Sequence, residues 1–157
     1  MQISREPVEV PLEPLIYEST DLTDLNELLK QVLQPLSGNG RNEDLVFRCS
    51  QLPFTRGDAA VFKEVFRELL RMIMARNSGR KFLHISCEEK KPSRGGEGQY
   101  EICFHTNFAT DSNWIRLFGE TILDCQARLR ACKAFLQVNE ISASGCLFSI
   151  SLQGKIF

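Results

Sequence analysis

The clearest periodic pattern in the chain lies between residues 58 and 75. Apolar residues recur there at the three-and-four spacing that places them on one side of a helix. They are Val61, Phe62, Val65, Phe66, Leu69, Leu70 and Ile73. Asp58 precedes the run and is a favoured N-cap residue, while Asn77 to Gly79 favour the end of a helix. The pattern predicts an amphipathic helix with one face in the core.

Alternation of polar and apolar residues predicts strands around this helix. Lys81 to Glu88 alternates with Leu83, Ile85 and Cys87 on one side, and Gln99 to Thr106 alternates with Tyr100, Ile102 and Phe104 on one side. The segment Lys90 to Gly98 between them is polar and glycine-rich, so we predict a hairpin with an exposed loop. A phosphate cradle is not indicated, because such loops lie between a strand and a helix N-terminus. Leu45 to Cys49 also has strand character.

The remaining elements follow from weaker patterns. Thr23 or Asp24 is expected to cap a helix of about 13 residues that ends at Pro35 and a Ser-Gly-Asn-Gly turn. A second long helix is predicted from Thr121 to Val138, followed by strands at 140–143 and 146–152. Asn107 to Gly119 has no clear period but is apolar enough to fold against the body. The predicted inward residues of the two helices are Leu25, Leu28, Leu29 and Val32, and Ile122, Leu129, Cys132, Phe135 and Leu136.

This order of elements predicts one α/β domain over residues 1–157. The expected fold class is a two-layer sandwich, with about three helices on one face of a mixed β-sheet. Residues 1–20 contain Pro7, Pro11 and Pro14, which exclude a helix there. We expect this segment to form an N-terminal extension or to contribute a short edge strand at 15–17.

Composition narrows the function classes. The chain has 157 residues, 43% hydrophobic and 25% charged, with a formal net charge of -1. Without a basic field, binding to nucleic acid is not expected. An apolar run of membrane-spanning length and a signal peptide are both absent from the sequence, so a cytoplasmic location is expected. The six cysteines show no CxxC spacing, which favours reduced buried thiols over disulfides or a metal site.

Several segments resemble the ATP-binding domain of sensor histidine kinases. In that family a Leu-Pro pair and a Gly-Asp pair precede a phenylalanine-containing helix, and here Leu52-Pro53 and Gly57-Asp58 precede the helix that contains Arg67 to Met74. The segment Asp24 to Val32 resembles the opening helix of the family, and Leu129 to Leu136 resembles its last helix. The resemblance implies a Bergerat-type ATPase fold, of the GHKL class.

The resemblance also implies where the ligands of Mg²⁺ and ATP would lie. The Mg²⁺-binding asparagine of the family corresponds to Met72, and a thioether is a poor ligand for a cation that prefers oxygen. One turn earlier stands Glu68, which is either a surviving general base or a solvated helix glutamate. The metal site of the family is therefore not expected to function here.

Two further nucleotide-binding motifs of the family are also altered. Its adenine-binding aspartate and neighbouring glycine correspond to His105-Thr106-Asn107, and its phosphate-binding glycine box corresponds to a segment without glycine that carries Asp124 and Arg128. His84 and His105 fall in predicted strands, so neither is expected to be the helical phosphoacceptor of a histidine kinase. The resemblance thus implies a degenerate nucleotide pocket formed by Glu68, Met72, His105, Asn107, Asp124 and Arg128.

These observations predict a degenerate, non-catalytic histidine-kinase-type domain without a bound cofactor or metal. Its expected role is a protein-interaction module in a two-component-like signalling pathway, with Trp114–Phe118 as the surface for a protein partner or self-association. Packing of this stretch on its own domain is an equal alternative. A second interpretation is a nucleotide-binding kinase domain that uses ATP and Mg²⁺ through Glu68, Asp111 or Asn113. A third is a small-molecule sensor that uses the vacated pocket.

Overall fold

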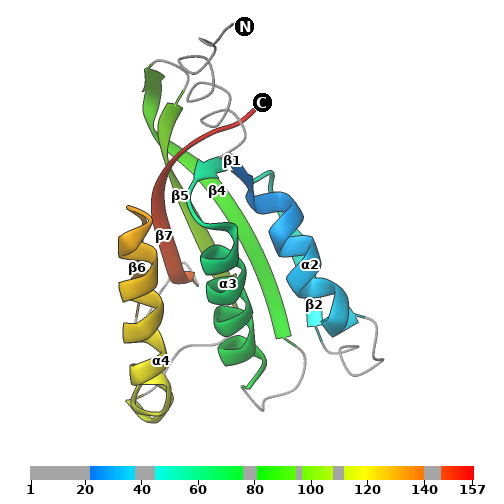
Figure 1. The fold of residues 1–157 in the computed structure, drawn as a ribbon. Coiled ribbons are helices and arrows are strands. Elements are labelled where there is room, and N and C mark those ends of the chain that lie inside the picture. The colour runs from blue at the N-terminus through cyan, green and yellow to red at the C-terminus, as the bar shows by residue number, and fades with distance from the viewer. Residues whose placement is uncertain (1–21, 38–44, 76–80, 95–96, 108–111, 140–145) are drawn as a thin grey trace, which may run out of the picture.

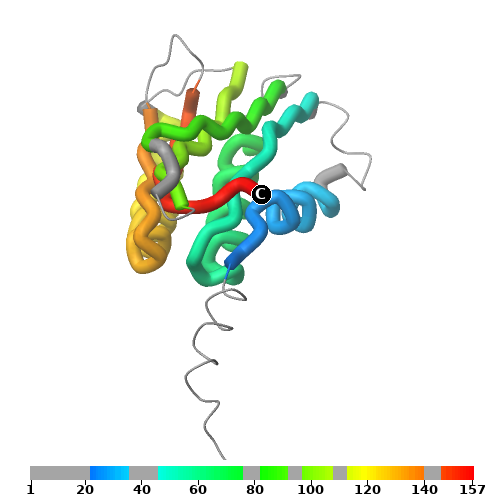
Figure 2. The backbone as a smooth tube through the Cα atoms, turned by 90° about the horizontal axis from the view of Figure 1, so that it is seen from above, coloured from blue at the N-terminus to red at the C-terminus, as the bar shows by residue number. Residues whose placement is uncertain are grey.

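Three helices cover one face of a mixed, seven-stranded sheet (Figure 1), and no helix of the described residues covers the other face, which we call the open face. The computed structural model describes residues 22–37, 45–75, 81–94, 97–107, 112–139 and 146–157. Seen from above, the helices all lie on the same side of the strands (Figure 2). The helices are α2 (Leu25–Ser37), α3 (Ala59–Met74) and α4 (Ser112–Ala131). This arrangement confirms the predicted two-layer α/β fold class.

The sheet has the order β1-β3-β7-β5-β4-β2, and β6 pairs with β7 off this path. The strands are β1 (Leu22–Asp24), β2 (Leu45–Cys49), β3 (Phe54–Arg56), β4 (Lys81–Arg94), β5 (Glu97–Thr106), β6 (Phe135–Val138) and β7 (Cys146–Lys155). Only the β2–β4 pair among these is parallel. The short strands β1 and β3 were not predicted, because three residues are too few to show alternation.

The helix α3 is the centre of the core, as its periodicity predicts. Asp58 caps it by accepting a hydrogen bond from the Ala60 N–H at 2.9 Å. The ring of Phe66 lies 6.2 Å from the ring of Phe104, which lies 6.3 Å from that of Phe148. These contacts join α3 to the middle strands β5 and β7. The inward faces of both layers are therefore apolar and continuous.

The β4–β5 hairpin is confirmed, but its strands are longer than predicted. The strand β4 runs on to Arg94 and β5 begins at Glu97, so most of the segment predicted as a loop belongs to the ladder. Register shifts between Glu89 and Arg94 accommodate this polar extension. Backbone hydrogen bonds extend the ladder without needing an apolar face, so the side-chain pattern did not reveal it.

The helix α2 has the predicted length and buried face, and its end differs slightly. Pro35 lies inside the helix, which continues to Ser37. The side chain of Asn26 fixes α2 to the segment before β3, because its Nδ2 donates to the carbonyl of Leu52 and its Oδ1 accepts from the N–H of Leu52, both at 2.7 Å. The same asparagine belongs to the segment that resembles the opening helix of histidine kinases.

The predicted bounds of the last helix are wrong at both ends. The helix α4 already begins at Ser112 and ends at Ala131, and a turn with Lys133 at a φ of 60° follows. The left-handed residue stops the helix, and the N–H of Ala134 then bonds to the carbonyl of Leu129 at 2.9 Å. Phe135, predicted to face inward on that helix, lies on strand β6 and is 58% exposed.

Strand β6 pairs with β7 in an antiparallel hairpin. Strand β7 confirms the second predicted strand, and β6 lies at residues that the sequence pattern assigns to the end of a helix. The predicted strand at residues 140–143, its turn and the segment 1–20 lie outside the described residues.

Candidate functional site

Met72, at the position that corresponds to the Mg²⁺-binding asparagine, is a core residue. Its side chain is 0% exposed and belongs to the central hydrophobic cluster. Glu68, one turn earlier, lies nearer the surface of α3, where its carboxylate accepts a hydrogen bond from Arg71 Nε at 2.6 Å. Met72 therefore lies in a dry, apolar environment, whereas Glu68 takes part in an ion pair.

The positions from the predicted glycine box lie on α4, next to α3 (Figure 1). Asp124 and Arg128 form an ion pair with each other at 3.0 Å, and both side chains are exposed. Burial, followed by the negative charges of Glu68 and Asp124, raises the pKa of the neighbouring Cys125 thiol to about 11. Acidic side chains of both α3 and α4 therefore influence Cys125.

Aromatic side chains from the first half of α4 belong to the same hydrophobic cluster as Met72. The rings of Trp114 and Phe118 lie 5.2 Å apart, and Trp114 lies 5.9 Å from the ring of Phe148. The guanidinium carbon of Arg71 stands 5.8 Å from the ring centre of Phe118. Both aromatic residues are buried, so this part of the predicted docking stretch packs on its own domain. Leu117, by contrast, is 74% exposed.

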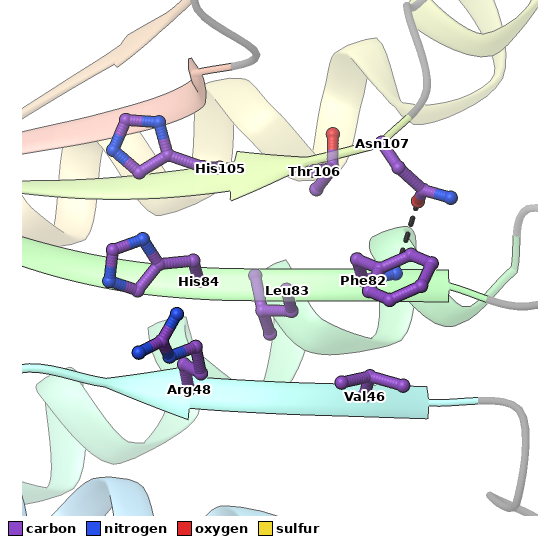
Figure 3. Close-up of a pocket in the computed structure, with 8 residues that line it drawn as sticks. All are labelled: Val46, Arg48, Phe82, Leu83, His84, His105, Thr106 and Asn107. Carbon is purple, nitrogen blue, oxygen red and sulfur yellow. Dashed lines mark hydrogen bonds between the residues drawn. The ribbon is translucent and has the colours of Figure 1, made fainter.

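His105 and Asn107, the remaining positions of the predicted pocket, lie away from α3 and α4. Phe104 points toward the helices, so the neighbouring His105 points to the open face of the sheet, where its ring stacks on His84 at 5.6 Å (Figure 3). Asn107 accepts a hydrogen bond from the N–H of Phe82 at 3.1 Å. The structure therefore does not bring His105 together with Glu68 and Met72.

The described residues around Met72 do not fit Mg²⁺. The cation needs several oxygen ligands in near-octahedral geometry, whereas Met72 offers a buried thioether and Asp124 is paired with Arg128. Among the described residues, His, Cys, Asp and Glu side chains form no group of three or more with metal-binding geometry. Within the same residues, none of the helices has the length and apolar character needed to span a membrane.

The fold matches that of histidine kinase ATP-binding domains. The mycobacterial sensor histidine kinase MprB aligns with a TM-score of 0.65 at 12% identity, over 87% of this chain and 98% of that chain. AdeS of Acinetobacter baumannii aligns with a TM-score of 0.59 at 16% identity, over 96% of this chain and 87% of that chain. The catalytic domain of histidine kinase ThkA aligns with a TM-score of 0.58 at 13% identity, over 87% of this chain and 97% of that chain.

The sequence itself matches no protein-family model and no curated protein. The similarity therefore concerns the fold, and it confirms the architecture that the sequence resemblance implies.

Proposed function

We propose that this chain is a histidine-kinase-type ATP-binding domain that has lost nucleotide binding. In this proposal it acts as a protein-interaction module in a two-component-like signalling pathway. The observation that carries the proposal is the complete burial of Met72 at the position that corresponds to the Mg²⁺-binding asparagine. A buried thioether cannot replace the oxygen ligand of a hydrated cation.

The surroundings of Met72 support the same proposal. Trp114 and Phe118 are buried in the same hydrophobic cluster as Met72 and add apolar groups to it. Arg71 and Arg128, on α3 and α4, are already paired with Glu68 and Asp124. Phosphate would compete with these carboxylates for the arginines and would be repelled by them. These features also favour loss of the pocket over its reuse for a small-molecule ligand.

The protein partner in this proposal contacts the exposed side of α4. Of the predicted stretch Trp114–Phe118, Leu117 is the exposed large apolar side chain, and we propose that self-association is made through it. Sedimentation velocity on the purified chain tests this proposal. Leu117→Glu should convert dimers to monomers, and Leu123→Glu, at another exposed leucine of α4, should not. A wild-type chain that stays monomeric at high micromolar concentration would exclude self-association.

Calorimetric titration with ATP and ADP, each with and without Mg²⁺, tests the loss of nucleotide binding. A ligand at a concentration 100 times its Kd stabilises the folded state by about 2.7 kcal/mol, so a thermal melt provides a second readout. We expect neither heat nor a shift of the melting temperature at millimolar nucleotide. Tight Mg²⁺-dependent binding that Glu68→Gln abolishes would instead favour the interpretation of a kinase domain with substitute ligands.

A further inference from the structure

Both histidines of the chain stand next to each other on the open face of the sheet. His84 on β4 is directly opposite His105 on β5, and their rings are stacked with an interplanar angle of 29°. Arg48 on β2 is directly opposite His84 on the other side. The three side chains form a row across three neighbouring strands (Figure 3), which we name the cationic row. Strand spacing makes the row roughly 10 Å long.

No carboxylate of the described residues forms an ion pair with Arg48. The acidic side chains of β4 and β5 on this face, Glu88 and Glu101, lie farther along the strands. Both contact Lys90, at 3.5 and 3.4 Å. The exposed side chain of Arg48 is therefore open to an external anion, whereas His105 Nε2 already lies 3.0 Å from the hydroxyl of Ser86.

Two thiols also lie near the histidines on this face. Cys103 precedes His105 by two residues on β5, and Cys146 on β7 is opposite His105. Burial, followed by the proximity of Cys146, raises the pKa of Cys103 to about 12. Cys103 therefore stays neutral below pH 9 and does not compete with an anion for the cationic row.

An apolar surface adjoins the cationic row. Val46 and Phe82 are opposite each other on β2 and β4, two residues before Arg48 and His84, and both are exposed. A shallow cavity of about 190 Å³ is lined by these side chains and by the cationic row. The apolar pair Val46 and Phe82 and the cationic row are separated by roughly 6.6 Å along a strand. This distance is close to the length of an aromatic ring that bears one anionic group.

We propose that this cavity binds an amphipathic anion, in which a carboxylate, sulfonate or phosphate is attached to an apolar or aromatic group. The anionic group lies on Arg48 and His84, with His105 completing the row, and the apolar group lies on Val46 and Phe82. This site is on the opposite face of the sheet from Met72, so it does not depend on whether nucleotide binds there.

The charge of Arg48 makes binding depend on the salt concentration. Salt screens the attraction between an exposed guanidinium and an anion, so we expect the affinity to fall as the salt concentration rises.

The test follows the two histidine ring signals of the whole chain by NMR during titration with benzenesulfonate at low and high salt concentration. We expect saturable shifts of both ring signals and a lower affinity at the higher salt concentration. Sulfate and benzyl alcohol, which each carry one half of the ligand, should bind about tenfold more weakly. Binding without salt dependence, unperturbed histidine signals or equally tight benzyl alcohol would overturn the proposal.

Variants then assign the binding to individual side chains. Arg48→Gln should weaken binding about tenfold, and His84→Gln should also weaken it. Arg130→Gln, at an exposed arginine of α4 in the helical layer, should leave the affinity unchanged. The replaced side chains are exposed, so the melting temperatures of the variants should not change. An unchanged melting temperature shows that a variant has lost binding and not its fold. Unaltered affinity in Arg48→Gln would contradict the assignment.

Discussion

Replacement of Met72 by asparagine restores the residue type of the histidine kinase family at a position that is closed in this chain. We predict that Met72→Asn strongly destabilises the protein and does not create a metal site. The side chain is 0% exposed and lies in the cluster that contains Phe66, Leu69 and Ile73. An amide at this position would therefore replace apolar packing with a polar group that lacks water.

The expected magnitude follows from two contributions. Truncation of a buried methionine costs about 2–5 kcal/mol, through lost transfer free energy and the cavity left behind. An unsatisfied buried amide adds about 1–3 kcal/mol. Asparagine fills part of the cavity, so we expect a total loss of about 4 kcal/mol. That loss is a large fraction of the usual free energy of unfolding of a domain.

Urea denaturation followed by circular dichroism measures this loss. Met74→Asn is the matched control, because Met74 lies on the same helix but is only partly buried, and it should cost less than about 1 kcal/mol. Met72→Leu keeps the volume and should cost less than about 1.5 kcal/mol. If Met72→Asn fails to fold, the Leu variant still tests the packing. A loss below about 1 kcal/mol for Met72→Asn, together with Mg²⁺-dependent binding of ATP, would show that this position is not a closed core site.

Three further perturbations separate packing, capping and titration. In urea denaturation, Trp114→Ala should lower the free energy of unfolding by about 3–5 kcal/mol. Leu117→Ala on the same helix should change it by less than about 0.5 kcal/mol. Equal effects of the two variants would contradict the burial of Trp114. Asp58→Ala removes the N-cap of α3 and should cost about 1 kcal/mol, with Asp58→Asn as a conservative control. The raised pKa of Cys125 stabilises the folded state below pH 9, and this contribution is lost as the pH rises from about 9 to about 11. Stability measured across that range should therefore fall more for the wild type than for Cys125→Ala, and parallel curves would contradict the assigned cause.

The sequence predicts α3 and α2 well because each has a clear apolar face, and α3 also has a clear N-cap. In α3 the N-cap Asp58 and the apolar spacing that starts at Val61 both indicate the start, and the structure places the helix there. In α2 the apolar face starts at Leu25 and the buried residues follow it. Alternation likewise predicts the inward faces of β4 and β5, and the fold class follows from the order of these elements.

The bounds of α4 could not be predicted from spacing alone. The residues Trp114, Phe118, Ile122, Cys125 and Leu129 follow one another at helical intervals, and all are buried. The same spacing continues through Cys132 and Leu136, beyond the real end of the helix. The turn at Lys133 ends α4 without a glycine, so the stop has no mark in the residue types.

The candidate site, too, could be predicted from the sequence only in part. The resemblance aligns His105 and Met72 as members of one pocket, but strand alternation already places His105 on the face opposite Phe104. The structure was needed to show that Trp114 and Phe118 are buried in the same hydrophobic cluster as Met72. The pairing of His84 with His105 depends on the register of two strands, which the sequence does not specify.

We expect that nucleotide does not bind beside Met72. The chain has three methionines, so methionine-methyl NMR reports directly on this position. Met72→Leu assigns its signal, and Met74, near the surface of the same helix, provides an internal control. ATP with Mg²⁺ is added to about 5 mM, so that even weak binding would be detected. We predict that the Met72 methyl signal stays unchanged. A saturable shift of that signal, dependent on Mg²⁺, would contradict the account.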